Sequence, residues 1–240
     1  MRDLGWDGYL NARDLGGLPT SLSTTGSTLF GRVARGPRRE LLTETGWQDA
    51  RRWGLGAIVD LRCAYEVGAR DGDPDVAPET CASVTVVSAP TEDHDDAEFR
   101  AVCFPILDSP LYWRHNWRIQ PELVRDALTA IATAPSGVLV HCSAGRDRTG
   151  MVSALLLSNA GVSPEDVAAD YAESVRAMVG AQTHSPTADR QAGWQAEEVA
   201  SWIAQTGPIV ADIASDPDGA FAAIGADADL RNRLRSLLTQ

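Results

Sequence analysis

The segment that most constrains the fold is a short apolar run followed by a polar loop and then by a helix-forming stretch. Residues 137–140 read GVLV, which is typical of a buried strand, and residues 151–159 favour a helix. Between them, residues 141–150 read HCSAGRDRTG. The loop is therefore predicted to lead into a helix N-terminus, where unpaired backbone N–H groups and the helix dipole favour an anion.

Within this loop, Cys142 and Arg148 are spaced to close around a single tetrahedral anion. A helix N-terminus and neighbouring cations favour the thiolate form of a cysteine, so Cys142 is the candidate nucleophile. The planar guanidinium of Arg148 can hold two oxygens of one phosphate group, which the point charge of a lysine cannot do. Gly145 and Gly150 allow the backbone to approach the anion closely. This pattern predicts phosphoryl transfer.

Two further residues of the loop have candidate supporting roles. The hydroxyl of Thr149 is expected within reach of the Cys142 sulfur, where it would stabilise the thiolate as it leaves a cysteinyl-phosphate. His141 is expected to organise the loop through backbone hydrogen bonds and not to act as a base. The predicted phosphate-binding residues are Ser143, Ala144, Gly145, Arg146, Asp147, Arg148 and Thr149.

Other interpretations of the loop account for fewer of its residues. A purely structural Cys142 with surface arginines leaves the agreement of strand, loop and helix unexplained. A sulfurtransferase needs no arginine six residues after the cysteine. A metal site is not implied, because the four cysteines include no C-x-x-C pair and the four histidines are scattered. A phosphate-binding module without turnover stays an alternative.

The N-terminal part of the chain adds a family resemblance. Residues 11–17 read NARDLGG, an arginine-bearing stretch follows at residues 32–36, and residues 59–62 read VDLR with Glu66 four positions later. Together with the C-x5-R loop, these motifs resemble the bacterial atypical protein tyrosine and lipid phosphatases, over residues 11–66 and 137–178. The resemblance implies a cysteine-dependent phosphatase fold with an extra helical lid and C-terminal region, and it implies no cofactor.

The chain departs from the pattern of this family at one position of the loop. Arg146 stands where the family usually has a lysine, which keeps the positive charge but changes the geometry. A second guanidinium at the mouth of the site suits a substrate with two phosphates, such as a phosphoinositide. A structural pair between Arg146 and Asp14, Asp60 or Glu66 would instead leave a plain phosphotyrosine enzyme.

The residue that protonates the leaving group has two main candidates. The resemblance implies Asp147, inside the loop, whereas other C-x5-R phosphatases bring an aspartate in on a separate loop, which here is Asp108. Three further acids on the stretch before Asp108 are weaker candidates: Asp93, Asp95 and Asp96.

Four charged residues near the N-terminal motifs are expected to support the site without taking part in the reaction. Asp60 and Arg62 follow a strand and are expected to pair and to hold neighbouring loops. Arg13 and Asp14 are expected to do the same for the phosphate loop, with a direct contact between Arg13 and the substrate as the alternative.

Length and order of the segments predict an α/β fold with a central, mostly parallel sheet flanked by helices. Residues 1–240 are expected to form a single phosphatase domain, with residues 181–193 as an exposed linker or lid and 194–240 as a C-terminal helical part. A helix capped by Thr43 is expected to end at Gly56, before a strand at 57–61, and a second buried strand is expected at 83–87. Further helices are expected to begin at Pro121 and to cover residues 164–178, 194–205 and 229–238.

The net charge and the hydropathy of the chain limit the classes of partner that it can bind. The net charge of −12 excludes a broad nucleic-acid-binding face, and no apolar run reaches the ~20 residues of a membrane span. The N-terminus lacks a signal peptide, so a cytoplasmic protein is expected, with export by another route left open. The expected activity is that of a protein tyrosine phosphatase with possible partners among phosphorylated proteins, phosphoinositides and small phosphomonoesters. The sequence does not indicate an oligomeric state.

Overall fold

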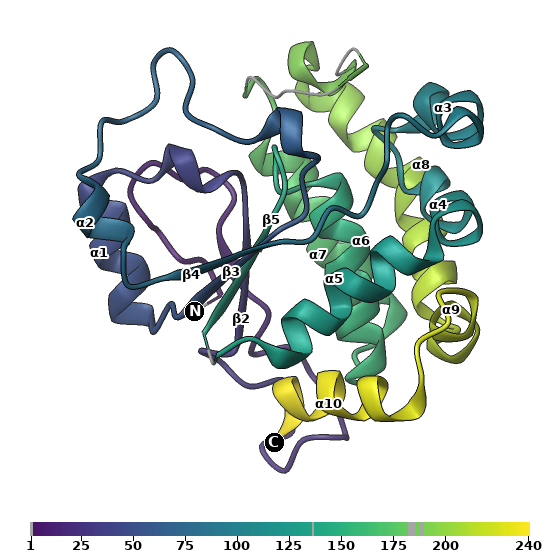
Figure 1. Cartoon of the computed structure of the whole chain (residues 1–240). Coiled ribbons are helices and arrows are strands. Elements are labelled where there is room, and N and C mark those ends of the chain that lie inside the picture. Colours follow the sequence, from purple (N-terminus) through teal and green to yellow (C-terminus); the bar gives the residue numbers. More distant parts are fainter. Residues whose placement is uncertain (1, 136, 182–185, 188–189) are drawn as a thin grey trace.

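The computed structural model describes residues 2–135, 137–181, 186–187 and 190–240, and Figure 1 shows their arrangement. Five strands form one sheet in the order β1-β2-β5-β3-β4. Only the β1–β2 pair is antiparallel, and the other three pairs are parallel. The fold is therefore α/β with a mostly parallel sheet, as predicted. The strands are β1 (Arg13–Asp14), β2 (Val33–Gly36), β3 (Ala57–Asp60), β4 (Thr85–Ser88) and β5 (Val138–His141).

Helices cover both faces of the sheet (Figure 1). On one face, α1 (Glu44–Trp53) packs Trp47 and Ala50 against strand residues such as Ile58. On the other face, α5 (Pro121–Thr133) and α6 (Asp147–Asn159) pack against strand residues such as Val140. Because successive side chains of a strand point to opposite faces, one apolar run supplies both cores.

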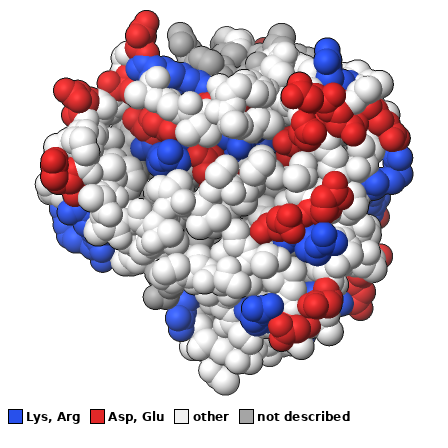
Figure 2. All heavy atoms as spheres, in the orientation of Figure 1, with Lys and Arg blue, Asp and Glu red and all other residues white. Residues whose placement is uncertain are grey.

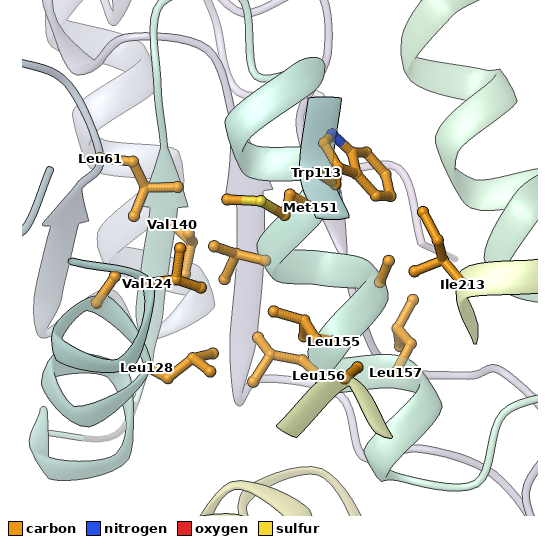
Figure 3. Close-up of a cluster of buried hydrophobic side chains, with 14 of the residues drawn as sticks. Leu61, Trp113, Val124, Leu128, Val140, Met151, Leu155, Leu156, Leu157 and Ile213 are labelled. Carbon is orange, nitrogen blue, oxygen red and sulfur yellow. The ribbon is translucent and has the colours of Figure 1, made fainter. Parts of the chain in front are cut away.

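The core on the α6 face is the larger one. In α6, every residue after Asp147 is buried, so this helix is enclosed on all sides instead of presenting one apolar stripe. Figure 3 shows Leu155, Leu156 and Leu157 of α6 surrounded by side chains from the sheet and from other helices. The helix that carries the loop residues at its N-terminus is therefore anchored along its whole length.

The end of α1 and the burial of β4 differ from the prediction. The helix α1 has Thr43 as its N-cap, as predicted, but it ends at Gly54 in the left-handed conformation and not at Gly56. The second strand was predicted to be buried, which is wrong: β4 lies at the edge of the sheet and its residues are exposed or half-buried. Its Val-rich sequence reads the same at an edge as in a centre, because β-propensity does not report position within a sheet.

Helices form most of the chain after the loop. The predicted helix at 164–178 is α7 (Pro164–Ala177) and the last one is α10 (Ala228–Thr239). The helix predicted to end at 205 continues to Ala214 as α8 (Ala196–Ala214), across Pro208. A further helix, α9 (Pro217–Ala223), was not predicted, although Asp216 caps it and a proline opens it.

The remaining helical segments are short: α2 (Pro78–Cys81), α3 (Ala97–Cys103), α4 (Trp113–Ile119), η1 (Arg39–Leu41), η2 (Ala64–Glu66), η3 (Phe104–Ile106), η4 (Pro110–Tyr112) and η5 (Arg190–Gly193). Much of the predicted lid or linker, at 182–185 and 188–189, lies outside the described residues. In the described part of the chain, no helix has the length and apolarity needed to cross a membrane.

The charged surface agrees with the acidic composition. On the face shown in Figure 2, Asp and Glu side chains gather in several clusters, with arginines set among them. That face therefore presents no broad basic surface of the kind that nucleic-acid backbones require.

The enclosed position of α6 predicts a large effect of truncating one of its side chains. Leu156 is 0% exposed, so Leu156→Ala should lower the free energy of unfolding by about 2–5 kcal/mol. Leu111 is 48% exposed, and Leu111→Ala should change that free energy by less than about 0.5 kcal/mol. Urea unfolding of both variants measures the difference, and equal effects would contradict this description of the core.

Candidate active site

The candidate site lies where the central strand β5 runs into α6. The strand is paired on both sides, with β2 and β3, and His141 at its end is opposite Gly36 and Asp60. Cys142 follows at once and is 2% exposed. Asp147 begins α6, so the loop between them faces the helix N-terminus at the carboxyl edge of the parallel strands.

The loop is held from outside through its carbonyl groups. The side chain of Asn11 donates to the carbonyl oxygens of Ala144 (3.3 Å) and Gly145 (3.2 Å). Arg35 Nη2 donates to the Gly145 oxygen as well, at 2.9 Å. Since the N–H and C=O of a peptide point in opposite directions, carbonyls tied outward leave loop amides turned inward. This is the arrangement that an anion-binding loop needs.

One buried carboxylate fixes the residues that hold the loop. Asp170, on α7, forms ion pairs with Arg2, Arg13 and Arg35. Burial would raise the pKa of Asp170, but the charges of these arginines outweigh it and hold the pKa well below its usual range. Arg13 also donates to Asn11 Oδ1, at 2.6 Å, so the side chain that binds the loop is itself oriented.

Arg148 lies between two carboxylates. Its Nη1 and Nη2 donate to the two oxygens of Glu66, the second at 2.7 Å, while Nε lies 3.7 Å from Glu92 Oε2. Burial lowers the pKa of Arg148, but the negative charges of Glu92 and Glu66 raise it by a larger amount, so the guanidinium stays charged. The same ion pair holds the pKa of Glu66 below its usual value against the opposing effect of burial. The cation is therefore fixed in position and in charge.

The two candidate acids lie in different elements. Asp147 is the first residue of α6, and Arg146 Nε donates to its Oδ2 at 3.1 Å. Asp108 is buried between η3 and η4, and its backbone carbonyl accepts a hydrogen bond from Gln191 at 2.7 Å. Burial raises the pKa of Tyr171, and the negative charges of Asp147 and Asp108 raise it further.

The pairing of Arg146 differs from each of the three structural pairs considered from the sequence. Asp14 accepts hydrogen bonds from two backbone N–H groups and from the indole of Trp53. Asp60 accepts a hydrogen bond from Arg62, and Glu66 accepts one from Arg148. Arg146 instead forms an ion pair with Asp147.

Behind the loop, Asp60, Arg62 and His141 form a buried group. Arg62 donates to both oxygens of Asp60, at 2.8 and 2.7 Å. Burial would raise the pKa of Asp60, but Arg62 and His141 lower it to about 2. Burial lowers the pKa of His141 to about 4, and its Nδ1 lies 3.0 Å from the Cys142 carbonyl oxygen. The neutral imidazole can donate there, which ties a further loop carbonyl outward.

The remaining predicted residues surround the same loop. Ser143 is buried, and its carbonyl accepts a hydrogen bond from the backbone N–H of Arg38 at 3.0 Å. The Thr149 hydroxyl is buried and makes no hydrogen bond to the described residues. In that part of the chain, no group of three or more His, Cys, Asp or Glu side chains is arranged to hold a metal ion.

Sequence reasoning missed several residues that hold the site. Asn11 and Arg35 belong to the motifs that carried the resemblance, and Glu66 was considered for its spacing from Arg62 and as a partner of Arg146, not as the partner of Arg148. Asp170 and Glu92 belong to no motif and approach the loop only through the tertiary fold. A buried arginine in a short strand was the available signal for Arg35, since such a charge requires a partner.

These features define a class of α/β protein in which the loop between the central parallel strand and a buried helix has the arrangement that anion binding needs, with an arginine in the first turn of that helix. The family model described as "Tyrosine phosphatase family" matches residues 4–223, and the chain belongs to this family.

Named relatives agree with this assignment. A Cupriavidus necator protein, provisionally named a tyrosine-protein phosphatase, is 29% identical over 72% of this chain and 63% of its own length. The triple specificity protein phosphatase PtpB of Mycobacterium tuberculosis is 29% identical over 70% of this chain and 67% of its own. A tyrosine-protein phosphatase of Nostoc commune is 31% identical over 62% of this chain and 52% of its own. The chain thus matches between about half and two thirds of the length of each relative.

The backbone of the loop predicts a strict requirement for glycine at one position. Gly145 has φ +68°, and a Cβ atom there would lie 2.4 Å from the backbone of Gly36. Gly145→Ala should therefore weaken the binding of inorganic phosphate by more than about tenfold. Gly26→Ala is the matched control, because Gly26 has φ +73° but open space around it. Equal phosphate affinity in the two variants, measured by calorimetry, would contradict this requirement.

The low pKa of His141 predicts a dependence of stability on pH. Between the unfolded pKa near ~6.5 and the folded value, the unfolded chain binds a proton that the folded chain does not. The free energy of unfolding should fall by up to about 3 kcal/mol as the pH drops from 6.5 to 4. His141→Asn should flatten this slope in urea titrations. His115→Asn, which replaces an exposed histidine, should retain it. A wild-type slope in His141→Asn would show that another group titrates.

Proposed function

We propose that the chain is a protein tyrosine phosphatase that hydrolyses phosphomonoesters through a phosphorylated Cys142. The observation that carries the proposal is the loop from Cys142 to Arg148, whose carbonyl groups are tied outward by Asn11 and Arg35. Amides fixed before the substrate arrives stabilise charge in the transition state without reorganisation.

The proposed reaction has two steps. The Cys142 thiolate attacks phosphorus and forms the S–P bond while the ester P–O bond breaks, and a proton passes from Asp147 to the departing oxygen. Loop amides and Arg148 hold the equatorial oxygens. A water molecule then attacks the cysteinyl-phosphate, gives its proton to Asp147 and releases phosphate and the thiolate. The Thr149 hydroxyl is available to stabilise that thiolate.

Asp147 is preferred over Asp108 as the acid because it belongs to the loop itself. Its side chain is 17% exposed and forms an ion pair with Arg146, so it can meet a leaving group and still be held in place. Asp108 is 8% exposed and separated from the loop in the chain.

The proposed substrates are aryl phosphomonoesters, with phosphotyrosine first. The name of the Mycobacterium tuberculosis relative, a triple specificity phosphatase, supports including phosphoserine, phosphothreonine and phosphoinositides among the substrates to be assayed. The proposed location is the cytoplasm, because a catalytic thiolate has to stay reduced and the four cysteines are free.

Replacing the nucleophile tests the proposal directly. Cys142→Ser should lower the turnover of a phosphotyrosine peptide by more than about 1000-fold, because a serine hydroxyl is a far weaker nucleophile. Binding of inorganic phosphate, measured by calorimetry, should persist because the loop and Arg148 are unchanged. Turnover within about tenfold of the wild type would rule out a phosphorylated Cys142.

Replacing the two aspartates in turn assigns the acid. Asp147→Asn should lower kcat by about 100-fold or more on alkyl phosphates, and less on aryl phosphates with good leaving groups. It should also remove the basic limb of the pH profile. Asp108→Asn should retain that limb, and the opposite result would give Asp108 the role proposed for Asp147.

A further inference from the structure

The carboxylate of Glu92 is shared unequally between Arg148 and a histidine. Glu92 Oε2 lies 2.7 Å from His94 Nε2 but 3.7 Å from Arg148 Nε. The first distance is that of a hydrogen bond and the second lies beyond one. The oxygen nearest the phosphate-binding arginine is therefore held by the imidazole and not by the guanidinium.

His94 is in turn oriented by its neighbours. Its Nδ1 forms a hydrogen bond with the hydroxyl of Tyr65. The imidazole stacks on the ring of Phe99, with 5.7 Å between centroids, and meets the edge of Phe104 at 5.3 Å. Both nitrogens thus have hydrogen-bond partners and the ring packs against two aromatic side chains, so the Nε2 atom has a fixed direction toward Glu92.

The position of Glu92 matters because Arg148 has a limited number of N–H donors. A guanidinium has five N–H groups in a fixed fork, and Glu66 takes one from each Nη atom. The Nε–H is among those that remain for a substrate phosphate. If Glu92 moved 1 Å closer, it would become a second carboxylate on the same cation and would compete with an incoming phosphate.

We propose that His94 is a positioning residue that holds Glu92 away from Arg148 Nε and so keeps this N–H available to the substrate phosphate. The inference deepens the proposed function and rests on Arg148 as the phosphate ligand. Tyr65, Glu92 and His94 also line a cavity of about 440 Å³. Loss of the imidazole would therefore leave the carboxylate room to move.

The test compares the binding of inorganic phosphate by calorimetry, which needs no turnover, with steady-state kinetics on an aryl phosphate. His94→Phe keeps an aromatic ring on Phe99 but removes both hydrogen bonds. It should weaken phosphate binding and raise KM by about tenfold, with a much smaller change in kcat. His94→Gln, whose amide can still donate to Glu92, should recover part of the affinity.

Removing the charge of Glu92 distinguishes two roles for this carboxylate: a competitor for Arg148 that His94 restrains, or a group that supports Arg148. Glu92→Gln should bind phosphate about two- to threefold more tightly than the wild type. His94→Phe combined with Glu92→Gln should then bind like Glu92→Gln alone, because no carboxylate remains to be restrained. If Glu92→Gln weakens binding and the double variant is no better than His94→Phe, Glu92 supports Arg148 and the proposal is wrong.

Two controls keep the result interpretable. Should His94→Phe not fold, Tyr65→Phe removes only the hydrogen bond to Nδ1, at an exposed side chain, and should weaken binding in the same direction by about twofold. His115→Phe makes the same replacement at an exposed position and should leave binding unchanged. A chain that binds phosphate with this pattern but hydrolyses no phosphomonoester would overturn the proposed function and keep the role of His94.

Discussion

The carboxylate of Asp170 joins parts of the chain that are far apart in the sequence, and the shape of the phosphate loop depends on it. It lies 135 positions from Arg35 and 168 from Arg2, and it pairs with both. A buried guanidinium without a partner is costly, so Arg35 can sit against the Gly145 carbonyl only because Asp170 is there. The orientation of the loop backbone thus depends on the buried ion pairs of Asp170.

A second set of buried charges serves the opposite side of the loop. In the proposed mechanism, Arg148 has to remain charged and immobile inside the protein while it keeps hydrogen-bond donors for a substrate, and Glu66 and Glu92 provide the counter-charge. Glu66 forms a bidentate ion pair with Arg148, and Glu92 is held at a distance from it by His94. Fixing the cation before the substrate binds removes a cost that water or a mobile side chain would impose in the transition state.

Much of the fold and the family could be predicted because the information is local. The strand, loop and helix at residues 137–159 are continuous in the sequence, and turn and cap signals such as Thr43 depend on neighbours only. The β/α alternation was sufficient for the α/β assignment.

The residues that hold the site could not be predicted in the same way. Glu66 reaches Arg148 across 82 positions, and Asp170 reaches Arg13 across 157. The sequence shows only that a buried charge needs a partner, and the folded chain decides which one it meets. The edge position of β4 was missed for a related reason, because strand order is a property of the whole sheet.

The most direct test of Cys142 as the nucleophile is to stop the reaction with acid within milliseconds and to locate the phosphoryl group by mass spectrometry. Reaction of the wild-type protein with a phosphotyrosine peptide should leave a phosphoryl group on the sulfur of Cys142. Reaction of the Cys142→Ser variant with the same peptide should leave no phosphoryl group on any cysteine. A phosphoryl group on another residue, or hydrolysis with no phosphorylated protein under conditions in which phosphocysteine survives, would contradict the proposed mechanism.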